Sequence, residues 1–123
     1  MARILLIDDE DGLRTMLRRA LEQQGHQVAE ARDGREGLRL HRQEPAELVI
    51  TDIQMPDRDG LEVIMDLRRE SPGVKIIAIS GGGKMVSSHV SLEMAVPLGA
   101  ATTLTKPFRL EVLFDAVERL LAA

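Results

Sequence analysis

Short apolar runs alternate with amphipathic stretches along the whole chain. Positions 4–7 predict a buried strand, and apolar residues from Leu13 to Leu21 then recur at helical spacing until Gly25 ends the helix. Further strands are predicted at 26–31, 48–50, 74–79 and 102–105. Further helices are predicted over 34–40, 85–96 and 110–121, and one runs from Leu61 until Ser71-Pro72-Gly73 ends it. Strands that alternate with helices are typical of βα units around a parallel sheet. The pattern therefore predicts an α/β fold of five βα units.

Length and composition limit the domain organisation and the classes of partner. The 123 residues suffice for one core, and no linker or longer repeat interrupts the βα pattern, so residues 1–123 are predicted to form one domain. A net charge of -4 disfavours direct binding to nucleic acid and favours a protein or small-ion partner. The absence of cysteine excludes disulfides and thiolate sites and favours the cytoplasm. The run 4–7 is too short for membrane insertion.

Polar residues follow four of the predicted strands. Asp8 and Asp9 follow the first strand, Asp52 ends the third, Ser80 follows the fourth and Lys106 follows the fifth. Because the carboxyl ends of parallel strands share one edge of the sheet, we expect these five side chains to converge there.

Three neighbouring carboxylates repel one another, and a bound divalent cation relieves that repulsion. Oxygen ligands without histidine or cysteine favour Mg²⁺. An aspartate can also act as a nucleophile and form an aspartyl phosphate. Lys106 and the cation would offset the phosphoryl charge, and the Ser80 hydroxyl would donate a hydrogen bond.

Four motifs resemble those of bacterial two-component response regulators, in the receiver domain. They are LLIDD at 5–9, ARDGREGL at 31–38, DIQMPDRDG at 52–60 and TKPF at 105–108. The resemblance covers essentially the whole chain and is closest in form to single-domain, chemotaxis-regulator-like members. It implies a doubly wound, flavodoxin-like (βα)5 fold with strand order 2-1-3-4-5.

The resemblance also implies roles for individual residues. Asp52 would be the phosphoacceptor, and Ser80 and Lys106 would contact the phosphoryl group. Asp9 and Asp52 would bind Mg²⁺ together with the backbone carbonyl of Gln54, and Asp8 would assist through water. The peptide bond before Pro107 would be cis.

The same family implies the partners. A histidine kinase or a histidine phosphotransfer protein would supply the phosphoryl group, and a downstream protein target would read the result. Such a chain is not an enzyme in the usual sense, because it catalyses only its own phosphorylation and dephosphorylation. One departure concerns the signal output: Thr103 stands where the family commonly has an aromatic residue.

Two alternatives remain open at this point. Asp9-Glu10-Asp11-Gly12 resembles the signature of haloacid dehalogenase-type phosphatases, in which Asp9 would be the nucleophile. The other alternative is a phosphorylation-independent interaction module. It remains open because Thr103 lacks the aromatic ring that in this family couples the phosphoryl site to the outer surface. A P-loop at 81–84 is rejected, because Met85 replaces the required Ser or Thr. We expect the histidines His26, His41 and His89 to be at the surface or half-buried. We expect Arg14 and Arg18 to lie on solvated helix surface.

Overall fold

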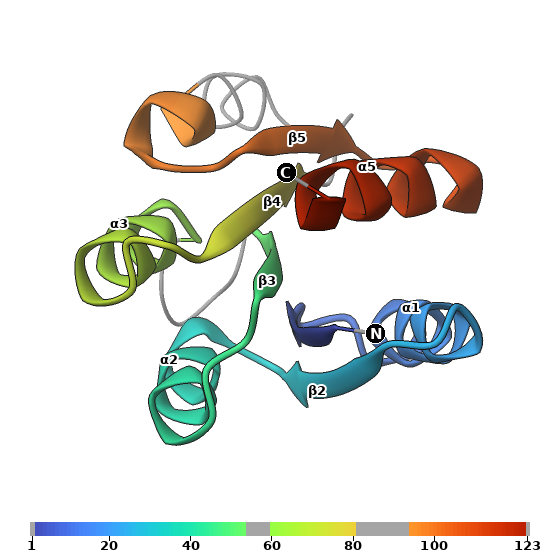
Figure 1. Cartoon of the computed structure of the whole chain (residues 1–123), viewed down its shortest axis with the longest axis horizontal. Coiled ribbons are helices and arrows are strands. Elements are labelled where there is room, and N and C mark those ends of the chain that lie inside the picture. Colours follow the sequence, from blue (N-terminus) through green and yellow to red (C-terminus); the bar gives the residue numbers. More distant parts are fainter. Residues whose placement is uncertain (1, 54–59, 81–93, 123) are drawn as a thin grey trace.

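Strands and helices alternate in the computed structural model, which describes residues 2–53, 60–80 and 94–122 (Figure 1). The strands are β1 (Arg3–Ile7), β2 (Gln27–Ala31), β3 (Leu48–Asp52), β4 (Lys75–Ser80) and β5 (Thr102–Thr105). The helices are α1 (Asp11–Gln23), α2 (Gly34–Gln43), α3 (Gly60–Glu70) and α5 (Leu110–Ala122). All neighbouring strands are parallel, in the order β2-β1-β3-β4-β5, which confirms the predicted fold class and strand order.

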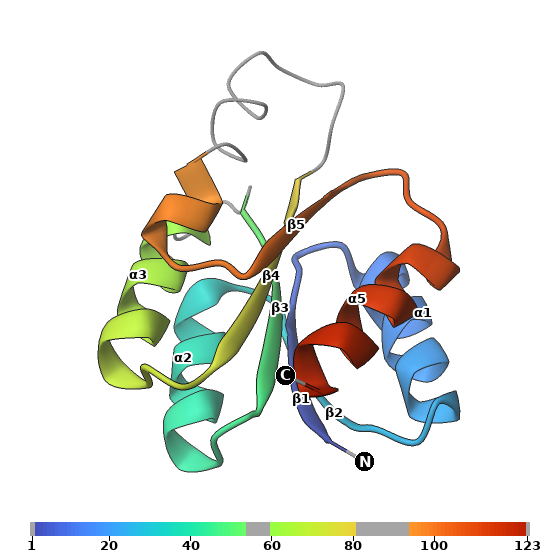
Figure 2. The ribbon, with the colours of Figure 1, turned by 45° about the horizontal axis from the view of Figure 1, so that its top comes forward.

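Helices cover both faces of this sheet, with α2 and α3 on one face and α1 and α5 on the other (Figures 1 and 2). Successive strand residues point to opposite faces. In β1, Leu5 and Ile7 therefore belong to the core beneath α2 and α3, while Ile4 and Leu6 belong to the core beneath α1 and α5. This double coverage explains why the strand is a continuous apolar run, and it leaves the strand ends as the edges available to a polar site.

The element boundaries agree with the sequence to within a few residues. Helix α1 ends at Gln23, and Gly25 follows with a φ of 97°, a conformation that L side chains rarely adopt. Ser80 is the last residue of β4. Of the predicted helix 85–96, residues 85–93 lie outside the described part of the chain, and residues 94–98 are helical. Among the described residues, no helix is long and apolar enough to cross a membrane.

The prediction that His41 lies at the surface or is half-buried is wrong, because 4% of the residue is exposed. Its Nδ1 accepts a hydrogen bond from the Ala46 N–H at 3.1 Å, and its Nε2 lies 3.1 Å from the Ser71 hydroxyl. Since Nδ1 acts as an acceptor, Nε2 carries the hydrogen and donates it to Ser71. Burial lowers the pKa of His41, and the Glu70 carboxylate only partly opposes this. His41 thus joins α2 to two loops in its neutral form.

We expect His41 to make the free energy of unfolding depend on pH. When the pH falls below 6.5, the ordinary pKa of histidine, His41 of the unfolded chain takes up a proton before His41 of the folded chain does. The folded state therefore loses stability. Above that value the contribution is fully present. Urea unfolding measured about one pH unit above and below 6.5 should show a smaller loss for His41→Asn than for the parent chain. An equal loss of stability in His41→Asn and in the parent chain would contradict this role of His41.

Candidate functional site

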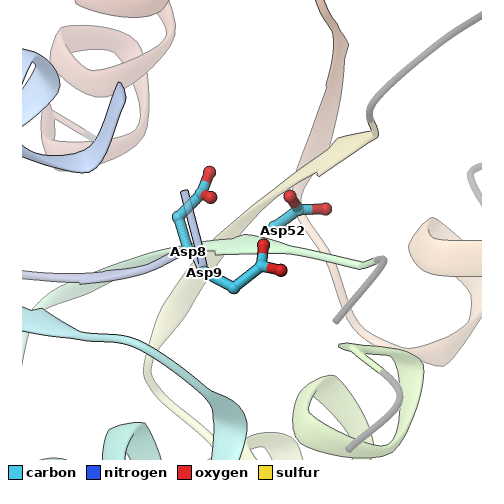
Figure 3. Close-up of side chains that lie close together, drawn as sticks. All are labelled: Asp8, Asp9 and Asp52. Carbon is cyan, nitrogen blue, oxygen red and sulfur yellow. The ribbon is translucent and has the colours of Figure 1, made fainter. Parts of the chain in front are cut away.

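Three aspartates gather where β1 and β3 end (Figure 3). Asp8 and Asp9 directly follow β1, and Asp52 is the last residue of β3, the strand beside it. One carboxylate oxygen from each residue lies within 4.8 Å of the other two. Asp8 and Asp52 are buried and Asp9 is exposed, so the cluster lies at the sheet edge with one side open.

Lys106 follows β5 and brings a positive charge to this cluster. Its backbone N–H donates to the Ser80 carbonyl at 2.8 Å, which fixes the start of the loop after the strand. Its Nζ lies 3.1 Å from Asp52 Oδ2 and 3.3 Å from both Asp8 Oδ2 and Glu10 Oε1. One ammonium group therefore contacts three carboxylates. The Lys106–Pro107 peptide bond is cis, as the resemblance implied.

Opposing effects set the pKa values of Asp8 and Lys106. Burial raises the pKa of Asp8, although the Glu10 N–H and Lys106 both lower it. Burial alone would lower the pKa of Lys106, but the Asp52 and Asp8 carboxylates outweigh it and raise that pKa. The lysine thus remains charged, whereas burial makes the charged form of Asp8 less favourable than that of an exposed aspartate.

The remaining residues singled out in the sequence have different placements. Ser80 ends β4, beside β3, and 1% of it is exposed. Thr103 pairs with Ala78 in β4 and is half-buried. Gln54, assigned a backbone ligand role by resemblance, lies outside the described residues.

Sequence reasoning missed two contributors to this site. Glu10, an exposed residue, contacts Lys106 as described above. Arg14, expected at the surface, is 8% exposed and donates from Nη1 to the Asp8 carbonyl at 2.7 Å. A signal for Arg14 exists in the sequence, because it shares a helical stripe with Leu17 and Leu21, the other buried residues of α1.

The donor set determines which ion would fit. Three carboxylates supply oxygen atoms only, and among the described residues no histidine or cysteine joins the group that could hold a metal. Such ligands suit a hard divalent cation, and a partly open site suits Mg²⁺, which keeps several waters. A cation here would also relieve the carboxylate repulsion that Lys106 offsets in part. The residues present therefore fit Mg²⁺.

Comparisons with known proteins place this arrangement in a family. A family model described as the response regulator receiver domain matches residues 4–118. The chain is 32% identical to the chemotaxis protein CheY of Halobacterium salinarum, over 98% of each chain. It is 31% identical to the transcriptional regulatory protein GlrR of Escherichia coli K12, over 95% of this chain, and spans only 26% of that relative.

A solved structure agrees with this assignment. The response regulator protein TrrA from Thermotoga maritima, determined in complex with Mg²⁺-BeF, superposes with a TM-score of 0.85 and 31% identity. The match covers 98% of this chain and 99% of that one. Receiver domains bind Mg²⁺ at an acidic pocket, and this chain has an aspartate cluster in the same fold. The match to this family decides against the haloacid dehalogenase-type phosphatase, the alternative in which Asp9 would be the nucleophile. The chain belongs to the response regulator receiver domain family and is a phosphoacceptor switch of two-component signalling.

Proposed function

We propose that Asp52 is the residue that accepts the phosphoryl group. The observation that carries this proposal is the 3.1 Å contact between Lys106 Nζ and Asp52 Oδ2 inside the three-aspartate cluster. Asp52 is the only one of the three that lies within a strand, where the sheet ladder holds its backbone through the pairing with Ile79. A nucleophile held in this way needs little reorganisation before it attacks.

The transfer follows from the groups present. A carboxylate oxygen of Asp52 attacks phosphorus, the bond from phosphorus to the donor's imidazole nitrogen breaks, and an aspartyl phosphate forms. Lys106 would remain beside the transferred group and offset its charge, and the Ser80 hydroxyl would donate a hydrogen bond to a phosphoryl oxygen. Catalysis in such a site consists mainly of positioning and charge neutralisation.

We assign the Mg²⁺ site to Asp8, Asp9 and Asp52, with Gln54 contributing its backbone carbonyl. The cation would neutralise charge on the carboxylates and on the phosphoryl oxygens. The cluster geometry supports the three carboxylates, and the Mg²⁺-BeF complex of TrrA supports the class of ion. Gln54 rests on the sequence resemblance alone.

The partners are proposed by class. Histidine kinases or histidine phosphotransfer proteins would donate the phosphoryl group, and a downstream protein would recognise the phosphorylated surface. We propose that residues 1–123 act as one receiver domain in the cytoplasm, that they do not bind nucleic acid directly, and that their only catalysis is their own phosphorylation and dephosphorylation. The fit of the family model over residues 4–118 supports the domain assignment.

The phosphoacceptor assignment predicts a covalent adduct at one residue. Incubation with acetyl phosphate and Mg²⁺ should add one phosphoryl group to the parent chain, seen by intact mass as an acid-stable and base-labile adduct. Asp52→Asn should abolish the adduct, because an amide is not a nucleophile for this transfer. Asp66→Asn is the control, since Asp66 is also buried but lies on α3.

Each other outcome has a defined meaning. An adduct that persists in Asp52→Asn and disappears in Asp9→Asn would contradict the assignment of the nucleophile. A parent chain that takes up no phosphoryl group in the presence of Mg²⁺ would instead favour the phosphorylation-independent interaction module.

A further inference from the structure

Arg14 is a buried charge that the phosphoryl chemistry does not use. It lies on the face of α1 that packs against the sheet, and 8% of the residue is exposed. Removing a guanidinium group from water is costly unless its donors are all paired. The partners of Arg14 therefore show what its burial achieves.

Each nitrogen of the Arg14 guanidinium has a partner of its own. Nη1 donates to the Asp8 backbone carbonyl at 2.7 Å, Nε to Glu30 Oε1 at 2.9 Å and Nη2 to Asp11 Oδ1 at 2.8 Å. Glu30 lies on β2, where it pairs with Leu6 of β1 and thus faces α1. Arg14 consequently ties the end of β1 to β2 and to the first turn of α1.

The contact with Asp8 lies where the sheet no longer holds the chain. The last ladder bond on this side is from the Asp8 N–H to the Ala31 carbonyl, at 3.1 Å. The Asp8 carbonyl points instead to Arg14, and this carbonyl belongs to the same peptide unit as the Asp9 N–H. The Asp8 side chain accepts from the Glu10 N–H at 2.8 Å. Fixing this peptide unit thus orients two of the three carboxylates.

We propose that Arg14 is a positioning residue that holds the peptide between Asp8 and Asp9, so that their carboxylates face Asp52. This inference rests on the proposed Mg²⁺ and phosphoryl site. Arg18 supplies a natural comparison: it pairs with Glu30 Oε2 at 2.5 Å and with Glu22, but not with Asp8. A role limited to the stability of α1 and β2 would be shared by both arginines, whereas positioning of the acidic site belongs to Arg14 alone.

The test compares Arg14→Gln with Arg18→Gln. Titration with Mg²⁺, followed by amide NMR shifts, should give a dissociation constant for Arg14→Gln about 10-fold higher than that of the parent chain. A loss of this size is typical of removing a group that orients metal ligands. Arg18→Gln should stay within about twofold of the parent chain. Without metal, hydrogen exchange at the Glu10 amide should be faster in Arg14→Gln only, because that amide reports the position of Asp8. Arg14→Lys, which keeps the charge but not the fork of donors, should be intermediate.

The outcomes separate this inference from the proposed function. Equal Mg²⁺ affinities and equal Glu10 exchange for the two glutamine variants would overturn the role of Arg14. If Arg14→Gln does not fold, the same comparison is made between Arg14→Lys and Arg18→Lys. If Mg²⁺ shifts no amide of the parent chain, the proposed metal site fails, while the exchange measured without metal still decides whether Arg14 holds the Asp8 peptide.

Discussion

Gly60→Ala is expected to destabilise the protein by about 3 kcal/mol or more. A Cβ at this position would lie 2.2 Å from Ile53 Cα and 2.5 Å from the Asp52 carbonyl oxygen. Both are backbone atoms, so no change of side-chain rotamer relieves the overlap. Either α3 must move away from the end of β3, or β3 must shift, and the Gly60 N–H that donates to the Ile53 carbonyl at 3.2 Å would lose its partner.

The same substitution should impair the site. Asp52 precedes Ile53, so a shift of this backbone displaces the proposed phosphoacceptor from Lys106. Urea unfolding would measure the stability, and the rate of adduct formation with acetyl phosphate would report the site. Gly12→Ala is the matched control: a Cβ there meets nothing within 4 Å inside α1, and alanine should stabilise the helix by up to about 1 kcal/mol. Equal stability of Gly60→Ala and the parent chain would contradict the expected overlap.

Much of the fold and the convergence of the acidic residues could be predicted because both depend on strand ends. A strand buried on both faces is a continuous apolar run, and its polar continuation marks the sheet edge. Asp8, Asp52 and Lys106 are far apart in sequence, yet parallel pairing brings their strand ends together. The topology predicts the shared edge, but the contacts also need the length of the Lys106 side chain, because β4 lies between β3 and β5.

Arg14 and His41 are both more deeply buried than the sequence predicts, for a common physical reason. Residue type gives an average burial, and arginine and histidine are usually solvated or half-buried. Their actual burial depends on partners in other elements, such as Glu30 for Arg14 and Ser71 for His41. The spacing of their neighbours was the better guide: His41 shares a helical stripe with Leu38, as Arg14 does with Leu17. The identity of the partner strand or loop, in contrast, is a property of the tertiary fold.

Lys106→Met should destabilise the metal-free protein by about 2 to 4 kcal/mol. The lysine side chain is 15% exposed, and its partners Asp8 and Asp52 are more deeply buried. Removing the ammonium takes a positive charge away from two buried carboxylates that lie near each other, which is more costly than losing an exposed ion pair. Mg²⁺ should recover most of the loss, because a cation among the same oxygens replaces the missing charge. Urea unfolding with EDTA and with saturating Mg²⁺ measures both effects.

A double-mutant cycle with Asp8→Asn separates charge pairing from packing in this prediction. If Lys106 stabilises the fold by pairing with buried carboxylates, Lys106→Met should cost less in the Asp8→Asn background, with a coupling of at least about 1 kcal/mol in EDTA. The coupling should shrink in Mg²⁺, since the cation then screens Asp52 in both backgrounds. If the methylene chain of Lys106 acted only by packing, the loss would be the same in both backgrounds and in both conditions. The change of this coupling energy with Mg²⁺ therefore measures how far Lys106 and the cation neutralise the same carboxylates.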